Sequence, residues 1–199
     1  SGVVIKSSIT NFANSLLIST DGSTGTLNAA ANNTGLGDQV FDDLTSGTDN
    51  TAMGSGALDA LTTGGSNTGL GRAALGSTTT GGSNTAVGKD ALLANTTGSG
   101  NIGIGLDAGT AITTGNQNIA IGNEALLATT TNSGNTAVGY IALQDNTADH
   151  NTAVGGQALL QNTTGTRNVA VGSFSLDANT TASENTAVGY AALSANTTG

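Results

Sequence analysis

A repeat of seventeen residues is the feature that most constrains how this chain folds. The consensus unit is N-T-A-V-G-x-x-A-L-x-x-N-T-T-G-x-x, and successive units are seventeen residues apart except at one step, where the distance is sixteen. The ten units begin at Asn33, Asn50, Asn67, Asn84, Asn101, Asn118, Asn135, Asn151, Asn168 and Asn185. Residues 33–199 are therefore predicted to form a stack of similar coils, and residues 1–32 lie outside the repeat.

The length and residue types of the unit select β structure. Helical repeats run above about thirty residues, so seventeen residues with N-T-T-G cannot supply two helices. The β-branched T-A-V between Asn and Gly favours a short strand that ends in a turn, and we expect a second extended piece near A-L or N-T-T. The predicted fold is all-β: a parallel β-solenoid or β-roll of about ten coils, spaced by about 4.8 Å along a rod.

Four positions of the unit hold the same kind of residue in every copy. Position 1 is Asn, position 5 is Gly, position 13 is Thr, and position 4 is always apolar. Stacked Asn side chains are expected to pair their amides along the rod, and Gly is expected to supply a positive φ or a close backbone approach. Thr hydroxyls are expected to bond along their own column. We interpret these columns as structural, and we expect the variable positions 6, 7, 10 and 11 to face solvent.

The composition favours a fold held by many contacts between small side chains, rather than by one core of large side chains. Aromatic residues are 3% of the chain, and Trp, Pro and Cys are absent. Low hydrophobicity alone would permit disorder, which is the alternative to a stacked fold. A net charge of −9 with only four Lys and Arg residues disfavours nucleic acid as a partner. No apolar run is long enough to span a membrane, so membrane insertion is not expected.

The chain contains few residues that are candidates for catalysis. His150 is the only histidine, and the paired Asp42 and Asp43 are neighbours in sequence rather than a convergent group. The stretch "GIGLDAG" from Gly103 partly matches a calcium-binding β-roll phrase but occurs once, and "GLGRAA" from Gly69 resembles a dinucleotide loop without its helix. We expect no enzyme, and no catalytic, cofactor-binding or metal-binding residues. Glycoside hydrolysis by aspartates from different coils, meeting across a chain boundary, remains the alternative.

N-x-[ST] sequons form a further pattern. They are glycan acceptors in a eukaryotic secretory setting and turn residues otherwise. Four of the five occupy position 12 of the unit. These four are Asn95, Asn162, Asn179 and Asn196, and the fifth is Asn32, just before the first unit.

Two adjacent pairs of small or apolar residues, at positions 3 and 4 and at positions 8 and 9, predict self-association. Neighbours on a strand face opposite ways, so one member of each pair would need cover from another chain. A homotrimer is the leading arrangement; a monomeric solenoid and an open filament are the alternatives.

We expect different structures at the two ends of the chain. Residues 1–32 are expected to form a cap or connector containing a β-hairpin around Asp21 and Gly22. The sequence stops at "NTTG", and we expect further chain or another subunit to cover this end.

Units such as "NTAVGYAALSANTTG" resemble the repeats of phage tail-fibre and related surface proteins. They are also similar to the head repeats of trimeric autotransporter adhesins, which carry a shorter unit of the form x-A-[IV]-G-x-x-A. The resemblance covers residues 33–199 and implies a trimeric fibre, extracellular or on a virion, that spaces or presents a host-binding region. The implied partners are other copies of the chain and a glycan or receptor on a host surface.

Ice binding is the rival function. Thr at position 13 and nearly always at position 14 forms two columns, although adjacent residues on a strand face opposite ways and do not share one flat face.

The single sixteen-residue step predicts where a strand ends and a corner begins. One residue is missing between Thr147 and Asn151. A deletion inside a strand would turn its side chains to the wrong face, whereas a deletion in a corner only tightens a loop. We therefore place this deletion, and His150, on a surface turn.

Overall fold

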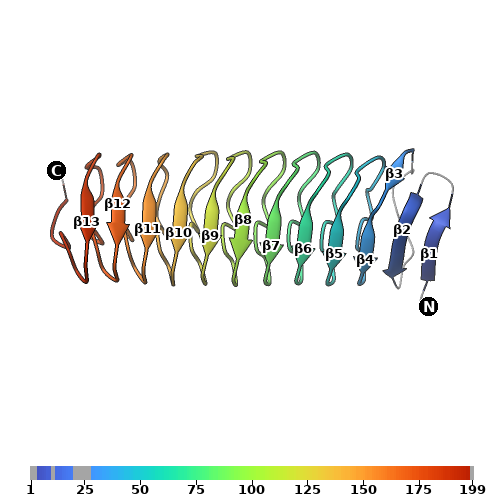
Figure 1. Ribbon diagram of the computed structural model, residues 1–199, viewed down its shortest axis with the longest axis horizontal. Helices are drawn as coiled ribbons and strands as arrows, with labels where there is room; N and C mark the ends of the chain where they lie inside the picture. The colour runs from blue at the N-terminus through green and yellow to red at the C-terminus, as the bar shows by residue number, and fades with distance from the viewer. Residues whose placement is uncertain (1–3, 10–11, 20–27, 198–199) are drawn as a thin grey trace.

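The computed structural model describes residues 4–9, 12–19 and 28–197. It contains one sheet of thirteen strands, and Figure 1 shows the strands side by side along a rod. The strands are β1 (Val4–Ile9), β2 (Phe12–Ser19), β3 (Ala30–Ala31), β4 (Thr34–Leu36), β5 (Thr51–Met53), β6 (Thr68–Leu70), β7 (Thr85–Val87), β8 (Ile102–Ile104), β9 (Ile119–Ile121), β10 (Thr136–Val138), β11 (Thr152–Val154), β12 (Val169–Val171) and β13 (Thr186–Val188).

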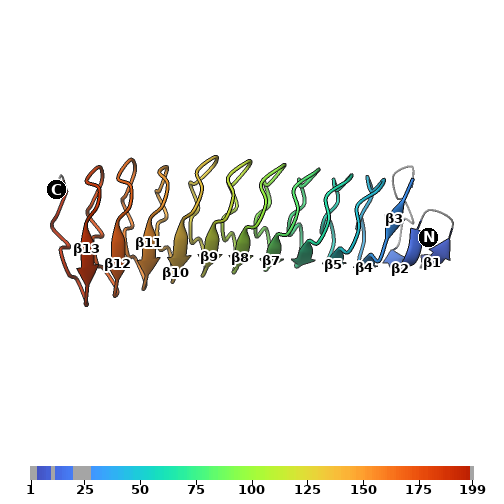
Figure 2. The same ribbon diagram turned by 45° about the horizontal axis from the view of Figure 1, so that its top comes forward.

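Each repeat unit forms one coil, and its T-A-V segment forms one strand of the parallel sheet. We number the coils 1 to 10 from Asn33 and keep the unit's position numbers. Strands β4 to β13 pair in parallel with strict register, so that Ala86 lies beside Gly103 and Ala120 beside Ala137. Figure 2 shows the strands along one side of the rod and the connecting turns along the other. The predicted β-solenoid is confirmed.

The parallel stack begins before the first repeat unit. Strand β2 pairs in parallel with β4, with Leu17 beside Gly35, and so forms a rung in front of coil 1. The antiparallel partner of β2 is β1, which precedes it. Strand β3 pairs with β2 in parallel. The turn expected at Asp21 and Gly22 lies outside the described residues.

Each coil in residues 28–197 has one strand where two extended pieces were expected. The A-L and N-T-T segments form turns, so the expectation of a second strand is wrong. The cause is a set of residues with positive φ at positions 7, 9 and 17, for example Ala73 (54°), Leu75 (56°) and Ser83 (60°) in coil 3. Left-handed residues turn the chain sharply, which closes each coil within seventeen residues.

The left-handed residue at position 9 also changes which side chains are inside. Ala74 at position 8 and Leu75 at position 9 are both fully buried. The strand alternation that would have sent one of them outward does not apply to a turn. The expectation that another chain must cover one member of this pair is therefore wrong. Columns of such Ala and Leu residues form the core of the rod.

Glycine at position 5 has both of the predicted features, a positive φ and a close approach to the backbone of the next coil. Its φ lies between 127° and 146° in all ten coils. A β carbon on Gly105 would lie 2.7 Å from the carbonyl carbon and oxygen of Gly122 in the next coil. A side chain at this corner would therefore separate neighbouring coils.

Asparagine at position 1 forms the predicted ladder. Asn67 is fully buried, and its side-chain NH₂ donates to Asn50 Oδ1 (3.1 Å) and to the carbonyl of Gly81 (2.9 Å). Its backbone N–H donates to the same Asn50 Oδ1 (2.9 Å). The Thr column also bonds along the rod, because Thr62 Oγ1 donates to the backbone carbonyl of Thr79 (3.0 Å).

The sixteen-residue coil confirms the position of the deletion. Strands β10 and β11 keep their register, with Ala137 beside Ala153. The carbonyl of Ala148 accepts a bond from the Asn135 side-chain NH₂ (2.9 Å), which is the role of position 15 in other coils. The missing residue is therefore position 14, on a corner, and His150 is exposed on the following turn.

Candidate functional site

The outward side of the sheet is the most extensive candidate surface. Alternation along each strand puts position 3 inside and positions 2 and 4 outside, and Ala86 at position 3 is fully buried. We call the outward residues the outer face. They are Leu16, Ile18, Thr34, Leu36, Thr51, Met53, Thr68, Leu70, Thr85, Val87, Ile102, Ile104, Ile119, Ile121, Thr136, Val138, Thr152, Val154, Val169, Val171, Thr186 and Val188.

The outer face carries no charged side chain: position 4 is apolar in every coil, and position 2 is Thr, Ile or Val. Every one of these residues is Thr, Val, Ile, Leu or Met. Met53 is 52% exposed, Leu36 44% and Ile104 37%. Tyr140 and Leu106 are also exposed, at position 6 just beyond the Gly corner, where Arg72 and Lys89 stand in coils 3 and 4. Because large exposed apolar patches often mark interaction sites, the outer face is the candidate interaction surface of this chain.

Charges in coils 1 to 10 lie on other sides of the rod. Asp90 is bound by Arg72 (2.8 Å) and by Lys89 (2.9 Å) on the turn after the strand. Arg167 and Glu184 pair at position 17 of neighbouring coils (3.1 Å). Two chains of net charge −9 repel one another. The outer face is the strip of the rod on which no carboxylate lies.

The described molecule belongs to the class of β-solenoids. Comparisons with protein-family models, with curated proteins and with solved structures find no match to this chain.

The two Gly-rich phrases belong to regular coils. Gly103 lies in β8 and Asp107 on the turn that follows, where its N–H donates to the Lys89 carbonyl (3.1 Å). Gly69 lies in β6 and is followed by turns rather than by a helix. In the part of the chain that the structure describes, no group of three or more His, Cys, Asp or Glu side chains is arranged to hold a metal ion. The described residues include no helix that is long and apolar enough to cross a membrane.

Three of the sequon asparagines lie inside the rod. Asn95, Asn162 and Asn179 are fully buried, whereas Asn32 is exposed. The Asn162 side-chain NH₂ donates to Asn146 Oδ1 (2.8 Å) and to the Gly165 carbonyl (2.9 Å). A glycan does not fit these three buried positions. The sequence held a signal for this burial, because Leu and Ile replace Asn at position 12 in other coils.

The two Thr columns differ in exposure and bonding. Position 13 hydroxyls, such as that of Thr96, donate to the carbonyl of the next coil (3.2 Å). Position 14 residues such as Thr97 and Thr114 are exposed. The columns named for ice binding therefore do not present two equivalent rows of hydroxyl donors.

Proposed function

We propose that this chain is a structural fibre segment whose copies associate side by side through the outer face. The observation that carries the proposal is the uncharged, apolar outer face, which runs from β2 to β13. In this role the rod spaces or presents a binding region on an extracellular or virion surface, as the repeat resemblance implies.

Continuous bonding along the rod supports a mechanical role. Each coil bonds to the next through its strand and its Asn, and most coils also through the Thr at position 13. The Thr85 N–H donating to the Asn101 carbonyl (2.9 Å) is one such link. Ten coils at the usual strand spacing give a rod of roughly 48 Å. Every unit of such a stack contacts only its neighbours, so the same bonds are repeated along the rod.

Side-by-side association follows from the shape and chemistry of the outer face. Sheets pack face to face at about 10 Å when their apolar sides are brought together. Three rods with their outer faces turned toward a common axis bury the Val, Ile and Leu column at position 4. A homotrimer is the arrangement that we propose.

Sedimentation equilibrium on the purified chain tests this assembly. At micromolar concentration the wild-type chain is expected at three times the monomer mass, and Ile104→Glu at the monomer mass, because a carboxylate would be buried in the interface. Thr114→Glu, on the exposed corner of the same coil, is the matched control and is expected to remain trimeric. A monomeric wild-type chain would overturn the proposed assembly.

Ice binding is the second candidate function. One observation favours it on the outer face, rather than on the Thr columns at positions 13 and 14. Thr34, Thr51, Thr68 and Thr85 stand in consecutive rungs of the outer face, each two residues from an apolar side chain. Inhibition of ice recrystallisation by the wild-type chain, lost in Thr68→Lys, would support this function. Absence of inhibition at millimolar concentration would dismiss it.

A further inference from the structure

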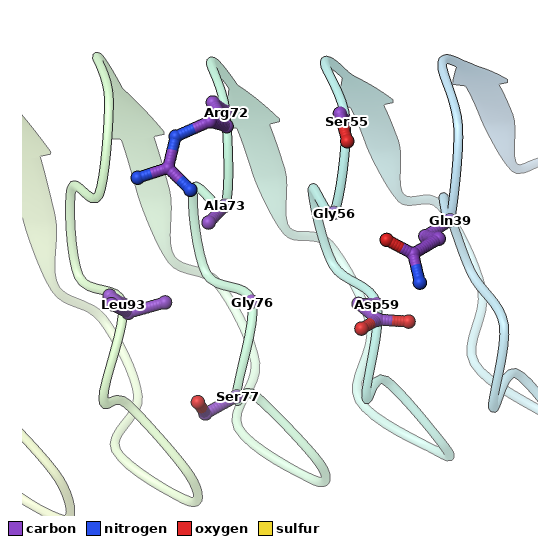
Figure 3. Close-up of a pocket in the computed structure, with 9 residues that line it drawn as sticks. All are labelled: Gln39, Ser55, Gly56, Asp59, Arg72, Ala73, Gly76, Ser77 and Leu93. Carbon is purple, nitrogen blue, oxygen red and sulfur yellow. The ribbon is translucent and has the colours of Figure 1, made fainter.

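A polar groove crosses the turns of coils 1 to 4, apart from the outer face (Figure 3). Its volume is about 300 Å³, which is at the lower end of the range for small-molecule sites. The groove exists because large side chains are missing where other coils have them. Gly56 and Ala73 occupy position 7 of coils 2 and 3, and Gly76 occupies position 10 of coil 3.

The walls of the groove combine hydrogen-bond donors and acceptors. Figure 3 shows the Gln39 amide and the Asp59 carboxylate reaching into the space between coils 1 and 2. Ser55 and Ser77 add hydroxyl groups, and Leu93 supplies an apolar wall at the other end. An amide, two hydroxyls and a carboxylate can together donate and accept in several directions.

The charge of the groove disfavours anionic ligands. Arg72 lines it but points along the rod, and its Nη2 binds both carboxylate oxygens of Asp90 (2.9 and 2.8 Å). Phosphate recognition uses cationic donors directed at the anion, and here the guanidinium is already neutralised while Asp59 adds negative charge.

Nucleobases and lipids also fit the lining poorly. None of the nine lining residues is aromatic, so a base has no stacking partner. Leu93 is the only large apolar side chain among them, which is too little to hold a lipid chain.

We propose that this groove binds a neutral saccharide. Sugar hydroxyls donate and accept at the same oxygen, which matches the amide, hydroxyl and carboxylate lining. The floor of Gly56, Ala73 and Gly76 lets a sugar ring approach the backbone. The groove spans four coils, or roughly 14 Å at the strand spacing, so it takes a short chain of sugars lying along the rod. This binding does not depend on assembly of the rods.

Filling the groove without disturbing the coil is feasible at Gly56. Position 7 holds non-glycine residues with positive φ in other coils, including Gln39 (53°) and Gln157 (60°). A β carbon on Gly56 would meet no atom closer than 3.9 Å. Gly56→Gln is therefore expected to fold normally and to occupy the groove. Ala191→Gln, at position 7 of coil 10 (φ 50°), is the matched control.

Titration of the ¹⁵N-labelled chain with maltotriose, cellotriose and chitotriose, followed by NMR, tests the proposal. At least one trisaccharide is expected to shift the amides of Gly56 and Gly76 and the Gln39 side chain saturably, with a Kd of about a millimolar. Gly56→Gln is expected to weaken that binding at least tenfold, and Ala191→Gln is expected to leave it unchanged.

Two results would overturn the saccharide site: no saturable shift with any of the three sugars, or equal binding by Gly56→Gln. Sedimentation of the same samples separates this outcome from the proposed assembly, because Gly56→Gln leaves the outer face intact and is expected to keep the wild-type mass.

Discussion

At the scale of single residues, two buried asparagines in neighbouring coils have different bonding. Asn101, at position 1, has its side chain fully used: Nδ2 donates to the Gly115 carbonyl (2.8 Å), and Oδ1 accepts from the backbone N–H (2.9 Å) and side chain (3.2 Å) of Asn118. Its own N–H donates to Asn84 Oδ1 (2.9 Å). Removing this side chain would strand several buried polar groups at once.

Asn95, at position 12, is only partly satisfied. Its Nδ2 donates to the Gly98 carbonyl (3.1 Å) and weakly to Thr78 Oγ1 (3.4 Å), whereas its Oδ1 is buried without a hydrogen-bond partner. The next residue in its column is Ile112, which offers no donor. The Gly98 carbonyl also accepts from Asn84 (2.9 Å), so it keeps a partner without Asn95.

The two asparagines therefore predict opposite outcomes. Asn101→Ala is expected to lower the free energy of unfolding by about 3 kcal/mol, because each unsatisfied buried group costs about 1–3 kcal/mol. Asn95→Leu is expected to be neutral or stabilising, as Leu61 already occupies this position in coil 2. Urea unfolding of both variants measures the difference. Equal losses would contradict the ladder as the source of stability.

The corner glycine gives a second prediction at this scale. Gly105→Ala is expected to lower the free energy of unfolding by at least about 2 kcal/mol, because its φ of 133° is strained for alanine and its β carbon meets the Gly122 backbone. Gly156→Ala is the control, since its β carbon would lie 3.8 Å from the nearest atom, Ser173 Oγ. Thermal unfolding that ranks the control as equally damaging would contradict close coil contact.

At the scale of the coil, the sequence predicts the features that depend on a residue type recurring at the same position of each unit. The strand at T-A-V, the Asn ladder, the Gly corner and the Thr column all follow from invariant residue types. The inward turn at A-L could not be predicted, because Leu rarely takes positive φ and nothing in Leu75 or Leu92 indicates it. That backbone feature decides that both apolar side chains at positions 8 and 9 are buried, whereas strand alternation sets the outer face.

Deletions test the division of the coil into strand and corner. Removing Thr63, at position 14 of coil 2, is expected to cost little, since coil 7 lacks the same position and keeps its register. Removing Ala86, in β7, is expected to unfold that part of the rod because it turns Val87 inward. Circular dichroism and urea unfolding compare the two. Equal tolerance would contradict the strand boundaries.

At the scale of the whole molecule, the sequence predicts a rod and predicts self-association through the pairs at positions 3 and 4 and at positions 8 and 9, but not which member of each pair faces outward. The outer face depends on which member of the position 3 and 4 pair points inward, and Ala137 buried beside a half-buried Val138 shows it in coil 7. The saccharide groove depends on small residues at two variable positions lying together, which becomes visible only when the coil path is known. Both surfaces arise from stacking rather than from a motif.

Disulfide trapping tests the central claim, that copies meet through the outer face. Three copies related by rotation about a common axis run parallel, which brings the same residue of each copy together. The chain contains no cysteine, so single substitutions give unambiguous pairs. Val154→Cys, on the outer face of coil 8, is expected to form interchain disulfides under mild oxidation, and Thr164→Cys, on the exposed corner of the same coil, is expected to stay reduced. Pairing at Thr164→Cys but not at Val154→Cys, or equal pairing at both, would contradict assembly through the outer face.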